Sequence, residues 1–181
     1  MEAIIAIRSQ FAAARASYPV EWIQKRDTFG AVRALRQGKL LVVMVDLNTT
    51  RGGLEADFLG LPACSPTGPA RLARRLRVPV VPAVSVRVAP GRATLSLLPP
   101  LRHLAGPESD PSFTAELYRR FEPWVVEYAE QYNWLHPRWR HRPDGSVWST
   151  KQAFAEQASR RTRPFLDLPP RVRALLAEPT R

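Results

Sequence analysis

Apolar residues near the start of the chain recur with a period close to 3.6 residues, which predicts a helix over Glu2–Ala16. A Tyr-Pro pair ends this helix, because the residue before a proline avoids the helical conformation. A short strand is expected at Val20–Ile23. Asp27 or Thr28 then caps a second helix, which stops at Gly38.

The longest unbroken apolar run is Leu40–Val45. Because it has no polar alternation, it predicts a strand that is buried on both faces, as in a parallel sheet. The run ends at Asp46. From there to Leu61 the Asn, Thr and Gly residues favour turns, so this stretch is predicted to be a loop.

A third helix is predicted to begin at Thr67 or Gly68, with Pro69 in its first turn, and to run to Arg77. A second apolar strand follows at Val78–Val88, and Pro-Gly then turns the chain. These signals continue the alternation of helices and strands found in the first half.

The last strong signals are a strand at Ala93–Leu98, a proline-rich loop and a long helix capped by Ser112. This helix carries an apolar stripe that is more typical of a core than of a site: Phe113, Leu117, Phe121, Trp124, Val125, Tyr128 and Tyr132. The order of elements predicts an α/β fold with a central, mostly parallel sheet flanked by helices. Ligands of such folds gather at the carboxyl ends of the buried strands, where Asp46 stands.

Length and composition fit one globular domain, since the chain has 181 residues, of which 45% are hydrophobic and 24% charged. No apolar run approaches the roughly 20 residues that cross a bilayer, and the start does not resemble a secretory signal. Beyond residue 142 the chain becomes rich in Arg and Pro. We therefore expect a domain over residues 1–142 and a basic extension over 143–181, with weak helices at Lys151–Ser159 and Pro170–Ala177.

The net charge of +11 predicts a polyanionic partner: nucleic acid, an anionic membrane or a phosphorylated small molecule. Cys64 is the only cysteine, which excludes an intramolecular disulfide and a cysteine-based zinc site. The three histidines, at positions 103, 136 and 141, have no metal-ligand spacing, so no metal is expected. His103 and Glu108 form a His-x4-acid pattern, but chance matches to this pattern are common.

The loop after the predicted buried strand collects polar groups. Asp46, Asn48 and Arg51-Gly52-Gly53 offer a carboxylate, an amide and a guanidinium, which suit a polar substrate. Asp46 would orient a hydroxyl or a catalytic partner, and Arg51 would hold a phosphate or carboxylate. The alternative is that Asp46 only caps local backbone N–H groups.

Two further features are candidates for binding. Thr67 and Gly68 open a helix, and free N–H groups at a helix N-terminus attract anions. An aromatic and basic cluster follows the long helix, and it suits base stacking, phosphate binding, a membrane interface or simple packing: Trp134, Leu135, His136, Arg138, Trp139 and Arg140.

Eight segments, taken in order, resemble the bacterial lipid A biosynthesis acyltransferases, the late lauroyl and myristoyl transferases. They are Lys25-Arg26-Asp27, Arg33-Ala34-Leu35-Arg36-Gln37-Gly38, Val45-Asp46-Leu47-Asn48, Arg51-Gly52-Gly53, Phe58-Leu59-Gly60, Ser65-Pro66-Thr67-Gly68-Pro69-Ala70, Val78-Pro79-Val80-Val81-Pro82-Ala83 and Trp134-Leu135-His136-Pro137-Arg138-Trp139-Arg140. The resemblance covers about residues 2–142. Each match is weak alone, but their common order makes the set specific.

The resemblance implies a glycerolipid-acyltransferase-like fold and the transfer of a fatty acyl chain from an acyl carrier protein thioester to a hydroxyl of a glycolipid. It implies no cofactor, and it places the protein peripherally at the cytoplasmic face of the bacterial inner membrane. A histidine would act as general base, and nearby donors would stabilise the oxyanion. Asp46 matches the acidic position of the family, and Arg26 matches a basic position that is a candidate phosphate contact.

The chain departs from the family pattern in two places. The family's N-terminal anchor and its histidine-acid pair are expected upstream of Met1, so this chain corresponds to an N-terminally truncated member. It is either a fragment of an active enzyme or an inactive remnant. Asn48 stands where a second aspartate is common in the family.

A second hypothesis needs no catalysis. A basic module would dock on anionic lipid or nucleic acid through Arg51, Arg71, Arg74, Arg75, Arg77 and the arginines of the extension, and it would reach a membrane with Trp134, Trp139 and Trp148. No specific nucleic acid is expected on the acyltransferase reading.

Overall fold

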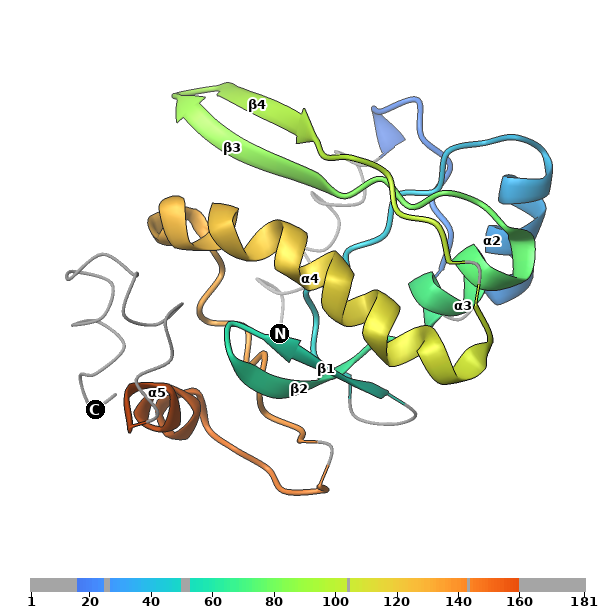
Figure 1. The fold of residues 1–181 in the computed structure, drawn as a ribbon. Helices are drawn as coiled ribbons and strands as arrows, with labels where there is room; N and C mark the ends of the chain where they lie inside the picture. Colours follow the sequence, from blue (N-terminus) through green and yellow to red (C-terminus); the bar gives the residue numbers. More distant parts are fainter. Residues whose placement is uncertain (1–15, 25–26, 50–52, 104, 143, 160–181) are drawn as a thin grey trace, which may run out of the picture. The chain divides into compact units, whose positions relative to one another are not determined.

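The computed structural model describes residues 16–24, 27–49, 53–103, 105–142 and 144–159. The chain divides into two compact units, Met1–Val42 and Val43–Arg181. Both helices and strands are present, as the sequence predicts (Figure 1). The helix expected at Glu2–Ala16 lies almost wholly outside the described residues, and the one expected at Pro170–Ala177 lies wholly outside them.

In the first unit, helix α2 (Thr28–Arg36) has the predicted ends. Asp27 is the N-cap, and its Oδ1 accepts a hydrogen bond of 2.8 Å from the N–H of Gly30. Gly38 has a φ of 74°, and the N–H groups of Gly38 and Lys39 return to the carbonyls of the last helical turn. This left-handed glycine satisfies the free carbonyls and stops the helix.

The strand expected at Val20–Ile23 is absent. This segment has no strand partner among the described residues, and the side chains of Val20 and Trp22 are mostly exposed. Its β-branched residues alone were therefore a misleading signal, because a strand is stable only when its backbone is paired.

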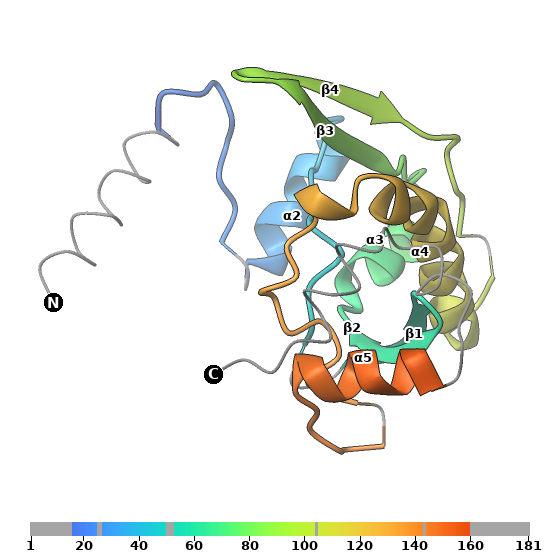
Figure 2. The ribbon, with the colours of Figure 1, turned by 90° about the vertical axis from the view of Figure 1, so that its left-hand side faces the viewer.

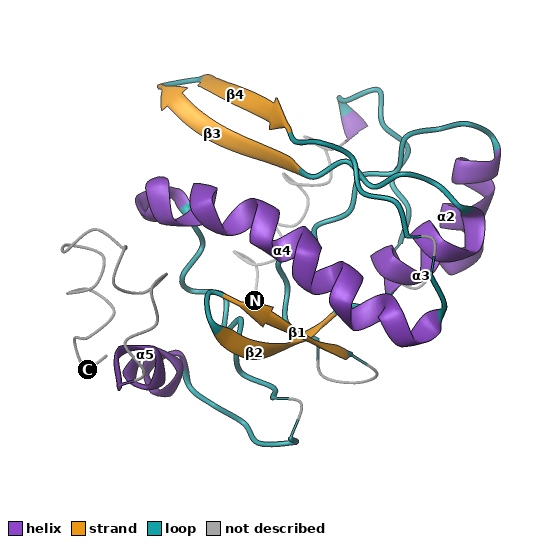
Figure 3. Cartoon of the chain, viewed as in Figure 1, coloured by secondary structure: helices purple, strands orange, loops and turns teal. Residues whose placement is uncertain are grey.

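The prediction of a buried parallel strand at Leu40–Val45 is also wrong. The segment is drawn as a loop in Figure 3, and Leu40 and Met44 are 88% and 69% exposed. Each sheet within the described part of the chain is a two-stranded antiparallel hairpin, so no central parallel sheet is seen there. An apolar run is buried in a sheet only when strands flank it, and both described hairpins pair within themselves.

The loop predicted from Asp46 to Leu61 contains a strand that sequence analysis missed. Strand β1 (Leu54–Phe58) pairs antiparallel with β2 (Leu61–Ser65). Leu59 and Gly60 join them, and both have positive φ values, of 49° and 76°. Two such residues match a type I′ turn, whose twist suits a hairpin. The inward positions alternate strictly with half-buried or exposed ones, which is the signal that could have revealed both strands.

Helix α3 (Gly68–Leu76) confirms the prediction based on Pro69, which lies in its first turn. A second hairpin follows, of β3 (Ala83–Ala89) and β4 (Arg92–Leu97), and it turns at Pro-Gly as expected. Strand β3 begins later than predicted. Before it, Val80 forms an isolated bridge with Leu101, and the carbonyl of Pro82 accepts a hydrogen bond of 2.8 Å from the N–H of Leu98.

Helix α4 (Asp110–Glu127) is the predicted long helix, although it begins two residues before the expected cap, Ser112. The short 3-10 helices η1 (Pro107–Ser109) and η2 (Ala129–Gln131) flank it. Helix α5 (Thr150–Ser159) closes the described part and agrees with the predicted helix there. In the second unit, α4 lies between the two hairpins, and α5 lies near β1 and β2 (Figures 1 and 2).

The core of the second unit surrounds the first hairpin. Phe58 is its centre, with ring contacts at 5.6 Å to Tyr118, 6.0 Å to Tyr132 and 5.9 Å to Trp139. The other buried members of this cluster are small or aliphatic: Ala56, Leu59, Leu61, Ala63 and Ala153. The apolar stripe of α4 thus serves the core, as predicted. Aromatic pairs of this kind add about 0.5–1.5 kcal/mol each beyond the area that they bury.

Candidate functional site

Asn48 joins the loop after Asp46 to the segment that follows α4. Its side-chain amide donates to the carbonyls of Arg138 at 3.0 Å, His141 at 3.3 Å and Cys64 at 3.4 Å. Its Oδ1 lies 2.7 Å from Nδ1 of His141, so this ring nitrogen carries the donated proton. One short amide thus holds together positions that lie far apart in the sequence.

The backbone of Asn48 makes a second connection. Its N–H donates to Nε2 of His136 at 2.9 Å, which requires that this nitrogen carries no proton. Burial lowers the pKa of His136 and outweighs the opposing attraction of Asp46. His136 is therefore held as a neutral acceptor and is not free to serve as a base through Nε2.

Arg138 lies beneath this junction and is only 1% exposed. Its Nη1 donates to the carbonyl of Cys64 at 3.2 Å, and its Nη2 donates to Oγ of Ser65 at 2.9 Å. The guanidinium also lies over the rings of Phe58 and Tyr118, at 5.2 Å and 5.1 Å from their centroids. No described residue forms an ion pair with it, so hydrogen bonds and ring faces stabilise the buried charge.

Asp46 is the carboxylate of this region, and its charge acts on three neighbours. Burial raises the pKa of both Tyr118 and Tyr132, and the charge of Asp46 raises each further. His136 also experiences this charge. Because Tyr118 donates to the carbonyl of Val45 at 2.8 Å, α4 fixes the backbone just before Asp46.

Gly53, a predicted site residue, has a packing role. A Cβ at this position would collide with Sγ of Cys64 and with the methyl group of Thr49. Only glycine therefore allows the end of the loop to approach β2 so closely. Arg51 and Gly52 lie outside the described residues, as does Arg26 of the first unit.

Thr67 and Gly68 lie at the start of α3, as predicted. The side chain of Thr67 makes no capping hydrogen bond, and the space beside Gly68 is open. Within the described residues, neither forms a hydrogen bond with the Asn48 junction, so the structure does not join this helix terminus to that group.

The aromatic residues of the predicted cluster pack inward. Trp139 is buried and donates to the carbonyl of Phe58 at 3.2 Å. Trp134 and Trp148 are half-buried against the same core, and Nε1 of Trp134 donates to the carbonyl of Ala129 at 2.7 Å. Leu135 is the exposed apolar side chain of this segment.

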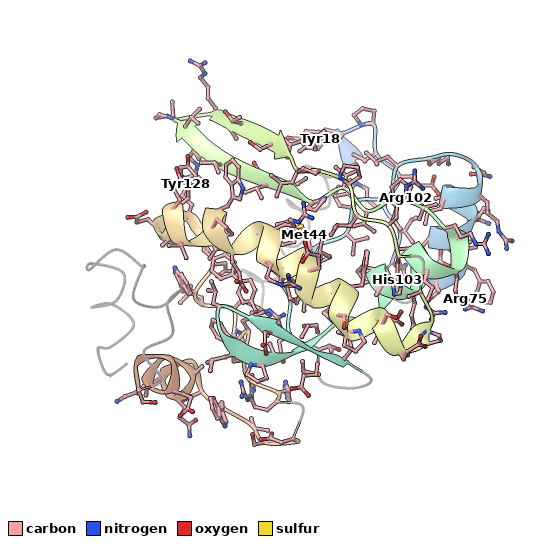
Figure 4. The ribbon with its side chains drawn as sticks, in the orientation of Figure 1. Tyr18, Met44, Arg75, Arg102, His103 and Tyr128 are labelled. Carbon is pink, nitrogen blue, oxygen red and sulfur yellow. The ribbon has the colours of Figure 1, made fainter. Side chains whose placement is uncertain are left out.

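A second buried polar group lies at the start of α4. His103 does not pair with Glu108; its Nε2 lies 2.7 Å from Oδ1 of Asp110, and its ring stacks on Phe113. Arg74 of α3 donates to the same carboxylate at 3.0 Å. Burial alone would raise the pKa of Asp110, but these two hydrogen bonds outweigh it and lower the pKa. Figure 4 shows His103 beside α3, with Arg75 nearer the surface.

Sequence analysis missed part of the junction. Tyr132 was assigned only to the core stripe and Tyr118 to no role. Cys64 was considered only for a disulfide or a zinc site, and His141 only as a metal ligand. A polar residue such as Asn48 following an apolar run was the visible signal, but its partners lie about 90 positions away, and no local pattern reveals them.

Within the described part of the chain, no group of three or more His, Cys, Asp or Glu side chains could hold a metal ion. No helix there is long and apolar enough to span a membrane. The junction is a polar group of a carboxylate, an amide and two imidazoles on a small α/β scaffold. The carboxylate of Asp46 is able to accept a hydrogen bond from a hydroxyl.

Residues 6–141 match the model of the family described as bacterial lipid A biosynthesis acyltransferase. The match spans well over half of the chain, which belongs to this family. It includes both sides of the Asn48 junction. No curated protein shows a significant match to the chain.

Proposed function

We propose that this protein takes part in the transfer of a fatty acyl chain from acyl carrier protein to a hydroxyl of a glycolipid, with Asp46 at the acceptor site. The observation that carries the proposal is the position of Asp46. The sequence resemblance assigns it to the family's acidic position, and it lies two residues before Asn48, which contacts residues 136–141. Family membership supports an acyl donor and a lipid acceptor in general.

In the proposed reaction the acceptor hydroxyl attacks the thioester carbonyl, a base removes its proton, and the carrier thiol leaves. Asp46 orients the acceptor hydroxyl. Asn48, His136 and Arg138 are positioning residues, because they hold the chain just after Asp46 against β2 and residues 136–141. The basic positions Arg26 and Arg51 are proposed to contact acceptor phosphates, and Gly52, Gly53, Thr67 and Gly68 to shape the same subsite.

Neither His136 nor His103 is proposed as the general base. Nε2 of His136 already accepts a hydrogen bond from Asn48, and His103 is buried against Asp110. The proposal therefore keeps the histidine-acid pair that the family resemblance implies as the base. We expect acyl transfer by this chain to depend on such a pair.

The same proposal places the protein peripherally at the cytoplasmic face of the bacterial inner membrane. In this proposal residues 1–142 form the acyltransferase-like part and residues 143–181 form an extension. Trp148 and Ala153 of the extension nevertheless pack in the core that surrounds Phe58.

The test is acyl transfer from acyl carrier protein to a lipid A precursor, measured for the chain joined to a family segment that supplies the histidine-acid pair. Asp46→Ala should lower the rate about a hundredfold, the usual effect of losing one group that stabilises the transition state. Asp57→Ala is the matched control, because Asp57 is an exposed carboxylate on β1. Equal rates for both variants would remove Asp46 from the mechanism.

The alternative function is a basic module without catalysis. Arg71, Arg75 and Arg77 are exposed on or after α3, whereas Arg74 is engaged with Asp110. Binding through these arginines alone must weaken steeply with salt, on DNA and on anionic lipid alike. Salt-insensitive retention on both would exclude this account.

A further inference from the structure

The hairpin of β3 and β4, here called the ribbon (residues 83–97), has two unlike faces. The register pairs Ser85 with Leu95 and Ala83 with Leu97, and it pairs Val86 with Thr94. Because side chains alternate along a strand, the first two pairs share one face and Val86 points to the other. Val86 is only 6% exposed, so its face is the covered one.

The other face of the ribbon is open. Leu95 and Leu97 are 65% and 68% exposed, and Ala83, Ser85 and Ala93 beside them are exposed as well. In the views of Figures 1 and 2 the ribbon lies at the margin of the second unit. Two neighbouring exposed leucines at one end of a sheet face are unusual for a surface that meets only water.

Positive charge lies on and near the ribbon. Arg87 shares the face of the two leucines, whereas alternation along β4 places Arg92 on the opposite face, at the turn end of the ribbon. Arg87 and Arg92 are exposed on the ribbon, and Arg102 is exposed shortly after it, where Figure 4 labels it. No acidic residue occurs between Ala83 and Arg102. Glu130, near the end of α4, lines a pocket together with Arg87. The ribbon itself therefore combines apolar side chains with positive charge, and this combination complements the boundary between anionic headgroups and acyl chains.

The ribbon is also fixed in place. The side chain of Gln131, at the end of α4, accepts a hydrogen bond of 2.8 Å from the N–H of Arg87 and donates one of 3.1 Å to its carbonyl. These bonds occupy the outer backbone edge of β3 at this position. They make strand addition by another chain unfavourable there and hold the leucine face in a constant orientation.

We propose that the ribbon docks on an anionic lipid bilayer, with Leu95 and Leu97 at the headgroup boundary and Arg87 and Arg92 on lipid phosphates. This inference deepens the proposed function, since it rests on a lipid acceptor and names the surface that meets the membrane. The tryptophans after α4 do not provide that surface, because they are buried or half-buried in the core.

The test is co-sedimentation of the full chain with vesicles of phosphatidylglycerol and phosphatidylethanolamine. The double variant Leu95→Ser, Leu97→Ser should lower the partition coefficient at least about tenfold, which equals about 1.4 kcal/mol. Phe29→Ser, which removes a side chain that is 90% exposed on α2, is the matched control and should leave binding unchanged. Unchanged binding of the ribbon variant, or an equal loss in the control, overturns the proposal.

Two double variants that remove arginines distinguish the ribbon from α3 as the membrane-binding surface. Arg87→Gln with Arg92→Gln should weaken binding to anionic vesicles, whereas Arg71→Gln with Arg75→Gln removes the same charge from α3 and should have little effect. The reverse result would assign membrane binding to α3. All four sites are exposed, so circular dichroism should show unchanged folding.

Two controls keep this inference separate from the proposed function. Asp46→Ala should bind vesicles as the parent chain does, whatever its effect on acyl transfer. A dimer in analytical ultracentrifugation that Leu95→Ser and Leu97→Ser abolish, together with vesicle binding that they do not alter, would make the ribbon a contact between copies and overturn the lipid assignment.

Discussion

A single amide group joins the two sides of the candidate site. Asn48 uses its donors and its acceptor at once, on the carbonyls of Arg138, His141 and Cys64 and on Nδ1 of His141. An aspartate, which the family resemblance leads one to expect here, is isosteric but cannot donate when ionised. The identity of this residue is therefore matched to the backbone carbonyls that surround it.

Asn48→Asp should destabilise the protein by about 2–3 kcal/mol, because it leaves carbonyls unpaired and places a carboxylate beside them. The loss should shrink as the pH falls, since a protonated carboxyl is uncharged and can donate one hydrogen bond. Urea unfolding at several pH values measures both effects. Asn133→Asp, at an exposed asparagine, is the control and should change stability by less than about 0.5 kcal/mol. Similar losses of stability in the two variants would contradict the role of the Asn48 amide in joining the two sides of the site.

His136 should make stability depend on pH in a defined direction. Its pKa in the folded protein is below the ordinary value of 6.5, so the folded state binds fewer protons than the unfolded state. Its contribution is complete above 6.5 and is lost as the pH falls below that value, through the folded pKa. His136→Gln keeps an acceptor for the N–H of Asn48 but does not titrate. The slope of unfolding free energy between about pH 7 and pH 5 should therefore decrease in the variant, and an unchanged slope would refute the assignment.

At the scale of elements, α3 ends in a conformation that its sequence does not favour. Arg77 follows the helix with a φ of 53°, in the left-handed region that glycine adopts most easily. Arg77→Gly should raise stability by about 0.5–1 kcal/mol, because it removes this strain. Arg75→Gly, inside the same helix, should instead lower it by about 1 kcal/mol. Thermal unfolding of the two variants measures these changes in stability. A loss of stability in both variants would show that the backbone of Arg77 is not strained.

Local signals predicted the elements whose stability is local. Asp27, Gly38 and Pro69 mark helix ends through their own backbone and side-chain chemistry, and the structure confirms all three. Leu40–Val45 failed because burial of a strand depends on partners that a local pattern does not contain. Strands β1 and β2 were missed because small alanines and Pro62 weaken an alternation that the core nevertheless obeys.

At the scale of the whole molecule, the predicted basic extension contributes to the core. Ala153 of α5 is fully buried in the cluster around Phe58, whereas Ala155 on the same helix is exposed. The extension is thus connected energetically to the first hairpin through at least one close contact.

Ala153→Arg should lower the unfolding free energy by at least about 3 kcal/mol, because it buries a charge in a packed core. Ala155→Arg adds the same charge at an exposed position and should change stability by less than about 0.5 kcal/mol. Urea denaturation gives the two values, and hydrogen exchange of the β1 and β2 amides shows whether the loss reaches the hairpin. An unchanged unfolding free energy in Ala153→Arg would show that the extension does not contribute to the core.

The candidate site could be predicted only in part. Asp46 and Asn48 follow a recognisable run, and His136 and Arg138 belong to a recognisable cluster, but nothing local shows that the two groups meet. Their meeting depends on the fold, since Tyr118 and Phe58 provide the surface on which Arg138 lies. Family resemblance assigned an acidic position to Asp46, which stays a prediction, and it contained no information about the amide junction.

The junction also has a consequence for the order in which the protein matures. Asn48 and His141 are 93 positions apart, so the two sides of the site cannot meet until residue 141 has left the ribosome. The exposed ribbon, by contrast, is complete in sequence some 40 residues earlier, once residue 97 has emerged. A nascent chain would therefore be able to touch a lipid surface before it possessed an acceptor site, and the membrane would be present while that site closes.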